Sequence, residues 1–143
     1  MHEPRYKQGM GLHYSVNASG ADHCSGIQDD QVIKTMPKGE GINVDGTLTT
    51  TELSPRKARL LYDEGLWRQV GNYIGMCVFV PWSNDQILSA VEAVTGWTMS
   101  GRELIDVVER GMTLARIFNL RQGLSKDDDT LPQRFFTSPQ RAR

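Results

Sequence analysis

The sequence predicts a mainly α-helical, compact domain with a long irregular N-terminal segment. Three stretches between residues 54 and 121 carry helix start signals, followed by apolar residues spaced three and four positions apart. Residues 1–53 instead hold half of the 14 glycines and show no helical stripe after Gly26. A chain of 143 residues is long enough for one domain with a real core. We therefore expect a single helical domain over residues 1–143, with a three-helix core at 54–121 and a loop and tail at 122–143.

Composition excludes several classes of protein. The net charge is −1 and no basic stripe occurs, so nucleic-acid binding is not expected. No apolar run approaches the roughly 18 residues of a membrane span. The first five residues lack the apolar core of a signal peptide. Two cysteines do not make a disulfide framework, which favours a reducing, cytoplasmic setting.

The N-terminal segment contains the best candidate for proton transfer. A short helix is expected over His13–Ala18, ending near Ser19-Gly20, where glycine can adopt the left-handed conformation. Small residues then flank His23 and Cys24, so the backbone can approach a ligand or another element closely. The imidazole of His23 titrates near neutral pH, although a purely structural role is the alternative. Cys24 is either a ligand or a small buried residue, and the pair lacks zinc-site spacing.

Residues 27–51 predict a long loop. Turn signals occur at Lys38-Gly39-Glu40-Gly41 and at Asp45-Gly46. A loop of this length in a compact domain is typical of a functional segment, or of one that packs on a surface outside the chain.

The first core helix is predicted to begin at Ser54, a preferred N-cap residue, with Pro55 at the first helical position. Cys77 extends the apolar face of this helix, so we expect a helix that ends on Gly75-x-Cys77 and carries a thiol into the interior. That face comprises Ala58, Leu61, Tyr62, Leu66, Val70, Tyr73 and Ile74.

The glycines and the charged residues of this helix predict how it contacts its neighbours and solvent. Gly65 and Gly71 each cost a helix up to ~1 kcal/mol relative to alanine, which indicates close approach to a neighbouring element. The charged residues fall mainly off the apolar face and are expected to meet solvent: Arg56, Lys57, Arg59, Asp63, Glu64 and Arg68.

The second core helix is predicted to start at Ser83, which forms a capping box with Gln86, and to end at Gly96. Its expected buried face is Ile87, Leu88, Val91 and Val94.

The third core helix is predicted to start at Ser100, with Glu103 completing another capping box, and to close at Gln122-Gly123. Asp106 and Arg110 are expected to pair on its outer face. No residue on it points to catalysis. Its long apolar stripe is Leu104, Ile105, Val108, Met112, Ala115 and Phe118.

Three consecutive aspartates, Asp127-Asp128-Asp129, follow the third helix. A metal site is one interpretation, but the spacing lacks the register of a calcium loop. A solvated turn is the favoured interpretation.

Several motifs together carry a resemblance to a known family. Gly9-x-Gly-Leu-x-Tyr14 through Gly20-Ala21-x-His23 is similar to a "G-x-G-L-x-Y…R-G-A-x-H" segment. Asn72-Tyr73-Ile74-Gly75-Met76-Cys77 is similar to a "D-x-x-G-L-C" motif. Gly96-Trp97, the "F-N-x-R-x-G" run of Phe118–Gly123 and the "D-D-x-L-P-x-R" run of Asp128–Arg134 follow in the same order. In this combination the chain resembles the C-terminal part of the aldehyde ferredoxin oxidoreductase family.

The resemblance implies a fold, an activity and cofactors. Family enzymes use tungsten or molybdenum held by two pterin dithiolenes, with a [4Fe–4S] cluster nearby, to oxidise aldehydes to carboxylic acids and reduce ferredoxin. Three cluster cysteines belong to a C-x-x-C-x-x-x-C motif outside this chain, and the fourth corresponds to Cys77. Asn72, Gly75 and Met76 fall in the motif that contacts one pterin. His23 corresponds to the histidine associated with proton transfer.

Two positions depart from the family pattern. Asn72 replaces the motif's aspartate, so the pterin contact is expected through an uncharged amide that both donates and accepts. Ser19 replaces the arginine of the R-G-A segment.

The chain by itself lacks the other three cluster cysteines and the N-terminal domains. We expect the missing N-terminal domains, ferredoxin and a small aldehyde substrate to be its partners. We therefore expect the isolated chain to be inactive and to bind none of these cofactors. The alternative hypothesis is a non-catalytic, stand-alone helical interaction domain that kept the fold. The sequence does not select between tungsten and molybdenum or identify the substrate.

Overall fold

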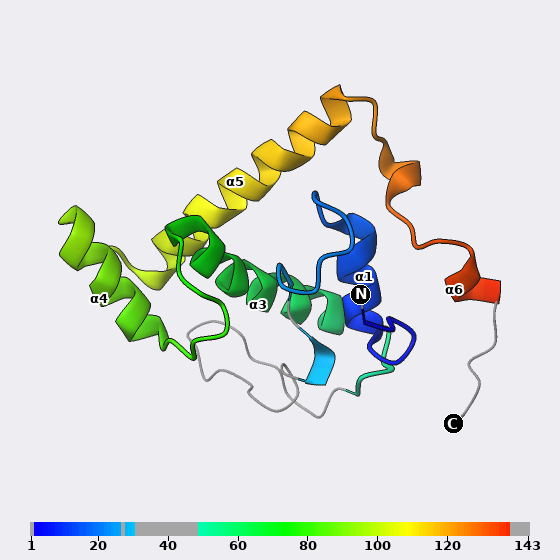
Figure 1. Cartoon of the computed structure of the whole chain (residues 1–143), viewed down its shortest axis with the longest axis horizontal. Helices are drawn as coiled ribbons and strands as arrows, with labels where there is room; N and C mark the ends of the chain where they lie inside the picture. The colour runs from blue at the N-terminus through cyan, green and yellow to red at the C-terminus, as the bar shows by residue number, and fades with distance from the viewer. Residues whose placement is uncertain (1, 27, 31–48, 138–143) are drawn as a thin grey trace.

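The computed structural model describes residues 2–26, 28–30 and 49–137. These residues form helices and no strand, which confirms the mainly α-helical prediction. Most of the predicted loop at 27–51 and the end of the tail lie outside the described residues. The elements, in chain order, are α1 (Gln8–Val16), α3 (Pro55–Ile74), α4 (Asn84–Thr95), α5 (Gly101–Arg121), the 3₁₀ turn η1 (Lys126–Asp128) and α6 (Arg134–Thr137) (Figure 1).

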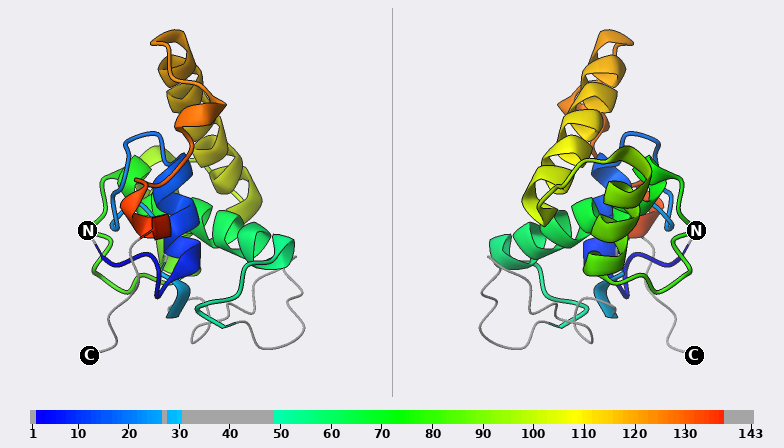
Figure 2. Two further views of the ribbon diagram at one scale, coloured as in Figure 1. Left: turned by 90° about the vertical axis from the view of Figure 1, so that its right-hand side faces the viewer. Right: turned by 90° about the vertical axis from the view of Figure 1, so that its left-hand side faces the viewer.

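Helix α3 is the centre of the arrangement. It packs against α5 and against α1, whereas α4 and α6 lie at opposite ends of the long axis (Figure 1). The C-terminal half of α5 extends away from the other helices, as both side views show (Figure 2). The buried apolar cluster joins α3, α4 and α5 and consists of Leu66, Val70, Ile87, Leu104 and Val108.

The helix boundaries follow the capping residues that the sequence predicts. The side chain of Ser54 accepts a hydrogen bond from the N–H of Lys57 at the start of α3. Both predicted capping boxes are formed at the starts of α4 and α5. Gly96 ends α4 in the left-handed conformation, with φ of 73°. These signals are local in sequence, which explains why they could be predicted.

Helix α1 begins earlier than the sequence predicts. It starts at Gln8 and is followed by Asn17 as C-cap, so Gly9 and Gly11 lie inside it and are buried. A Cβ atom at Gly9 would overlap the side chains of Leu61 and Asp29, so glycine allows α1 to pack directly on α3. The carboxylate of Asp29 accepts the N–H groups of Gly9 and Met10, at 3.0 Å each. A carboxylate from elsewhere in the chain therefore caps the first turn of α1.

Two charged residues of α3 that were predicted to meet solvent are buried. Lys57 forms an ion pair with the fully buried Asp29 and donates to the carbonyl oxygens of Thr49 and Thr50, at 2.8 and 2.9 Å. Glu64 is buried as well, and burial raises the pKa of its carboxyl group. The prediction was wrong because α3 buries one face in its first half and another in its second half. The first-half face includes Lys57, Leu60, Leu61 and Glu64, and the second-half face includes Leu66, Gln69 and Val70.

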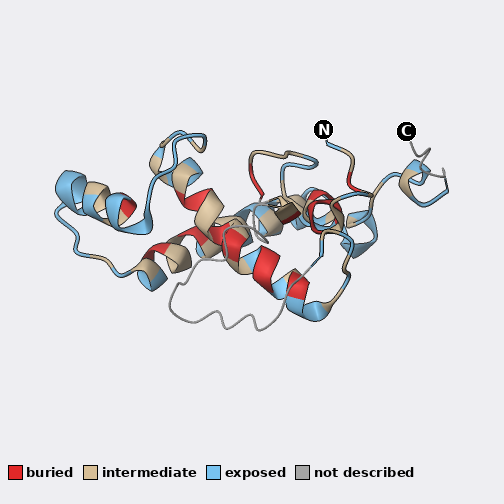
Figure 3. Ribbon diagram, turned by 90° about the horizontal axis from the view of Figure 1, so that it is seen from below, coloured by how far each residue is buried: buried red, intermediate tan, exposed pale blue. Residues whose placement is uncertain are grey.

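Several residues of the predicted apolar faces are exposed. Val94 on α4 and Phe118 on α5 expose 87% and 63% of their surface. Most of α4 is exposed, as the pale blue colour of its ribbon shows (Figure 3). Tyr62 and Tyr73 on α3 are nearly half exposed. Asp106 pairs with Arg102, at 2.7 Å, in place of the predicted Arg110.

The two glycines of α3 behave differently. A Cβ atom at Gly71 would lie 3.4 Å from the carbonyl oxygen of Met76, where the chain folds back after the helix. A Cβ atom at Gly65 would meet nothing within 4 Å. The predicted close approach is therefore wrong at Gly65, and at Gly71 the contact is an ordinary van der Waals one with the turn that follows the helix. None of the helices in the described part of the chain has the length and hydropathy of a bilayer-spanning segment.

Candidate functional site

The segment that follows α3 presents a thiol at the surface. Gly75 caps the helix in the left-handed conformation, with φ of 73°, and the N–H of Met76 bonds to the carbonyl oxygen of Gly71 at 2.8 Å. This turn takes Cys77 off the periodic face of α3. Cys77 is a free, exposed cysteine, so the prediction of a thiol carried into the interior is wrong for this chain. The thiol is instead accessible at the surface.

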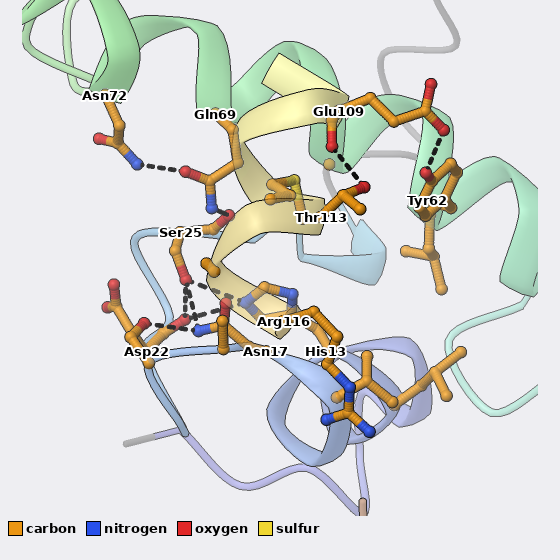
Figure 4. A pocket seen from close by; sticks show the side chains of 18 of the residues that line it. His13, Asn17, Asp22, Ser25, Tyr62, Gln69, Asn72, Glu109, Thr113 and Arg116 are labelled. Atoms are coloured by element: carbon orange, nitrogen blue, oxygen red, sulfur yellow. Dashed lines mark hydrogen bonds between the residues drawn. The ribbon is translucent and has the colours of Figure 1, made fainter. Parts of the chain in front are cut away.

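A chain of hydrogen bonds connects this motif to the His23 segment. Asn72, exposed in the last turn of α3, donates through Nδ2 to Oε1 of Gln69 at 2.8 Å. Gln69, one turn earlier and buried, donates in turn to the carbonyl oxygen of Ser25 (Figure 4). The two motifs are almost 50 positions apart in sequence and are thus tied together through α3. Sequence periodicity could not predict this link, because it depends on how the loop folds over the helix.

The His23 segment brings three metal-ligating side chains together. The ligating atoms of Asp22, His23 and Cys24 lie within 4.8 Å of one another, and all three residues are half-buried. Sγ of Cys24 lies 3.6 Å from Nε2 of His23, and Oδ1 of Asp22 accepts the N–H of Cys24 at 2.9 Å. The ring of His2 packs edge-on against His23, with centroids 4.7 Å apart. His23 therefore lies beside a thiol and a second imidazole ring.

A cavity of about 670 Å³ lies between α1, α3 and α5 (Figure 4). Asp22, which precedes His23, and Asn72, which begins the Cys77 motif, both line it. Residues of both motifs therefore line the same cavity, whereas His23 and Cys77 themselves are not among its described lining residues. Its walls come from all three helices and from the loop after α1, and they include His13, Ser25, Tyr62, Gln69, Glu109 and Arg116.

Helix α5 contributes polar groups to this cavity, although the sequence indicated only a structural role for it. The hydroxyl of Tyr62 donates to Glu109 across the α3–α5 contact at 2.5 Å, and this bond raises the pKa of Tyr62 to about 12. Arg116 makes two bonds, each of 2.7 Å, to the carboxylate of Asp129. Asp129 belongs to the aspartate run, in which Asp128 accepts the N–H of the N-cap residue Ser125 and completes the capping box of η1. The aspartate run therefore forms a turn, as the favoured interpretation predicted. Its last residue, Asp129, also fixes the position of Arg116 in the cavity wall.

His13 is the half-buried imidazole of the cavity wall. Its Nε2 lies 3.2 Å from the carbonyl oxygen of Asp22 and 3.1 Å from Oγ of Ser25. Burial lowers the pKa of His13, against a smaller opposing effect of the Asp22 carbonyl. A neutral ring that donates to this carbonyl must carry its proton on Nε2. His13 thus orders the loop that holds His23.

The stability of the fold is expected to fall as the pH drops through the ordinary pKa of histidine, 6.5. A folded-state pKa below the unfolded value gives stability that is present above the unfolded pKa and lost as the pH falls. His13→Gln keeps a polar side chain without the titration. Urea unfolding of both proteins at pH 7.5 and at pH 5 is the measurement, and the difference in unfolding free energy between them should shrink at the lower pH. A difference in unfolding free energy that is the same at both pH values would contradict the lowered pKa of His13.

Comparisons with known proteins show the family to which the chain belongs. The family model described as "Aldehyde ferredoxin oxidoreductase, domains 2 & 3" matches residues 1–143. The tungsten-containing aldehyde ferredoxin oxidoreductases of Thermococcus kodakarensis and Pyrococcus furiosus are each 27% identical, over 96% of this chain and 22% of their own length. The enzyme of the same description from Pyrococcus horikoshii is 26% identical over the same shares. No solved structure matches the chain.

The chain spans about a fifth of the length of these relatives, 22%. Its match lies within the second and third domains, which is consistent with a helical fold and with the collinear motifs. The remaining domains of such an enzyme are not represented in it. By the match over its whole length, this chain belongs to the aldehyde ferredoxin oxidoreductase family.

Proposed function

We propose that this chain is the C-terminal helical part of a tungsten- or molybdenum-pterin, [4Fe–4S]-dependent oxidoreductase that oxidises aldehydes to carboxylic acids and passes the electrons to ferredoxin. The observation that carries the proposal is the exposed thiol of Cys77, which lies two residues after the C-cap of α3 within the family motif. Because the chain spans 22% of its relatives' length, the proposed enzyme needs the remaining domains as well. The isolated chain is therefore inactive in this proposal.

The residues present fit the cofactors that the family uses. A cluster held by three cysteines of another segment needs a fourth thiolate that is reachable from outside, and Cys77 is free and exposed. Asn72 is exposed in the last turn of α3, five residues before Cys77, and its amide can bond the edge of a pterin. Gly75 and Met76 follow it at the turn, where Gly75 is exposed. When bound, the pterin metal and the cluster supply two-electron and one-electron redox chemistry, respectively.

The chain's own part in the reaction is proton handling and positioning. An aldehyde and a water molecule give a carboxylate, protons and two electrons, so a proton acceptor is needed near the reacting carbon. His23 is the candidate because an imidazole ring both accepts and donates a proton, and this ring lies beside Cys24 and His2. The His13 contact to Asp22 and Ser25 holds this loop in place.

The test is cluster retention in an assembled enzyme that contains this segment. Cys77→Ala is expected to lower the bound iron and to reduce aldehyde-dependent ferredoxin reduction by at least about 100-fold, since ligand loss removes a first-sphere thiolate. Cys24→Ala is the matched cysteine control and should retain the iron. Iron content and the electron paramagnetic resonance of the reduced cluster are the measurements. Equal iron in the Cys77→Ala enzyme would refute the ligand assignment.

A second candidate is a non-catalytic interaction domain. The departures at Asn72 and Ser19 favour it, because both replace residues of the family's site motifs. A purified 143-residue chain that is monomeric, well folded and colourless, without any partner gene product, would support it. The enzyme hypothesis instead predicts self-association, because Phe79, Trp97 and Phe118 expose more than 60% of their surface.

A further inference from the structure

We propose that Asp22, His23 and Cys24 form a binding site for one thiophilic divalent cation of the zinc class. The imidazole of His2 supplies the fourth ligand. The site lies in the loop after α1 and includes the residue that the proposed function assigns to proton transfer. Cation binding by this loop is independent of the proposed function, whereas its effect on the reaction rests on that function.

Two of the ligating atoms already have the separation of a tetrahedral zinc site. Sγ of Cys24 lies 3.6 Å from Nε2 of His23. Zn–S and Zn–N bonds of about 2.3 and 2.0–2.1 Å, at a tetrahedral angle of about 109°, place the two ligand atoms about 3.5–3.6 Å apart. The carboxylate of Asp22 belongs to the same cluster, in which all three atoms lie within 4.8 Å of one another. A side-chain shift of roughly 1 Å therefore allows one ion to contact all three.

The chemistry of the three side chains selects the kind of cation. A thiolate and a carboxylate together balance the charge of a divalent ion, and thiolate and imidazole ligands favour zinc over harder cations. Magnesium and calcium instead require several oxygen ligands, which this cluster does not offer. No other group of three histidine, cysteine, aspartate or glutamate side chains in the described part of the chain is arranged in this way.

The loop that carries the three ligands is held in place by its own contacts. The carbonyl oxygen of Asp22 accepts the hydroxyl of Ser25 at 3.1 Å and lies 3.2 Å from Nε2 of His13. The N–H of Asp22 donates to the carbonyl oxygen of Gly20 at 2.8 Å. A Cβ atom at Gly26 would overlap the ring of His13, so the loop packs directly on α1. A ligand set on an ordered loop loses less conformational entropy when it binds an ion.

The carboxylate of Asp22 is oriented within the cluster. Its Oδ1 accepts the backbone N–H of Cys24 at 2.9 Å. An ionised carboxylate has about four acceptor positions, so this bond leaves lone pairs for an ion. Hydrogen bonds of this kind orient ligands in metal sites.

His2 comes from a separate segment and lies against the same cluster. Its backbone N–H donates to the hydroxyl of Tyr14 at 3.3 Å, and its ring packs edge-on against His23, with centroids 4.7 Å apart. His2 is exposed, whereas the other three ligands are half-buried. A cation can therefore enter from solvent on the side of His2.

Occupation of this site has a consequence for the proposed reaction. A cation bound at Nε2 of His23 takes the lone pair with which this nitrogen would accept a proton. Zinc-class cations are therefore inhibitors of an enzyme in which His23 is the proton acceptor.

The first experiment measures cation binding by the reduced 143-residue chain. Titration with Co²⁺ should give the absorption of a cobalt–thiolate bond at one ion per chain, and Zn²⁺ should displace it. Competition with a chromophoric chelator should give a Kd for Zn²⁺ at or below about 1 μM, near the weak end of structural zinc sites. A large excess of Mg²⁺ should not compete.

Substitutions identify the ligands. Cys24→Ser should abolish the cobalt–thiolate absorption, and Cys77→Ser is the matched control that should retain it. His23→Gln and His2→Gln should each weaken zinc binding by about tenfold or more. Far-UV circular dichroism verifies that each variant is folded.

Three results would overturn the site: no cobalt–thiolate absorption, absorption that depends on Cys77 and not on Cys24, or a zinc affinity that His23→Gln leaves unchanged. An unchanged affinity in His2→Gln would overturn the fourth ligand.

The second experiment adds Zn²⁺ to the assembled enzyme and follows aldehyde-dependent ferredoxin reduction. Cys24→Ala should raise the zinc concentration that halves the activity by at least about tenfold. An active enzyme that binds zinc at this loop without losing activity would reject His23 as the proton acceptor. An assembled enzyme that never oxidises aldehydes, beside intact zinc binding by the chain, would reject the proposed function and leave the cation site standing.

Discussion

Asp29→Ala is expected to lower the free energy of unfolding by about 3–5 kcal/mol, because it leaves the ammonium of Lys57 buried without its partner. Both side chains are at most 5% exposed. The substitution also removes the acceptor of the Gly9 and Met10 N–H groups at the start of α1. Since a domain of this size has a total stability of roughly 5–15 kcal/mol, a loss of this size threatens folding itself.

Urea unfolding at pH 7 measures this effect, with two comparison proteins. Arg59→Ala removes the ion pair with Asp63, in which the arginine side chain is 72% exposed, and should cost no more than about 0.5 kcal/mol. The double variant Asp29→Leu with Lys57→Met should recover part of the loss, because no charge is then left buried. A single Asp29→Ala variant as stable as Arg59→Ala would show that the pair is not buried in solution.

Leu104→Ala is expected to lower the free energy of unfolding by about 2–5 kcal/mol, because it opens a cavity in the cluster that joins α3 to α5. Leu104 is 5% exposed and contacts the cluster that contains Leu66 and Val70. Leu114→Ala makes the same chemical change ten positions later on the same helix. Leu114 is 66% exposed, so its replacement should cost less than about 0.5 kcal/mol in the isolated chain.

Thermal and urea unfolding of both leucine variants provide the comparison. Equal losses of unfolding free energy in the two variants would mean that the C-terminal half of α5 is covered in solution, for instance by self-association. In an enzyme that includes the remaining domains, we expect the Leu114→Ala cost to rise if those domains pack on this half of α5. The pair therefore reports where the uncovered surface of the chain lies.

Helix starts and stops could be predicted from the sequence because their signals are local. Ser54, Ser83 and Ser100 each accept a hydrogen bond from a backbone N–H three residues ahead. Gly75 and Gly96 end their helices in the left-handed conformation. Neither kind of signal needs information from elsewhere in the chain.

The start of α1 and the buried face of α3 could not be predicted in the same way. Gly9 and Gly11 read as helix-breaking residues, yet they allow α1 to lie against α3, and Asp29 supplies the cap from 20 positions away. Lys57 reads as a surface residue, and only the approach of Asp29 explains its burial. Each case depends on a contact between segments that periodicity treats separately.

The candidate site likewise has features that could be predicted from local sequence and features that depend on contacts between distant segments. The sequence by itself determined the helical class, the caps and the order of the motifs that hold His23, Asn72 and Cys77, because residue types and spacing carry this information. Only the tertiary structure decided that Cys77 is exposed and that a line of hydrogen bonds through Gln69 joins the two motifs beside one cavity. The physical reason is that exposure and cavity walls are properties of how helices cross, and α5 contributes Glu109 and Arg116 to the site only because it packs across α3.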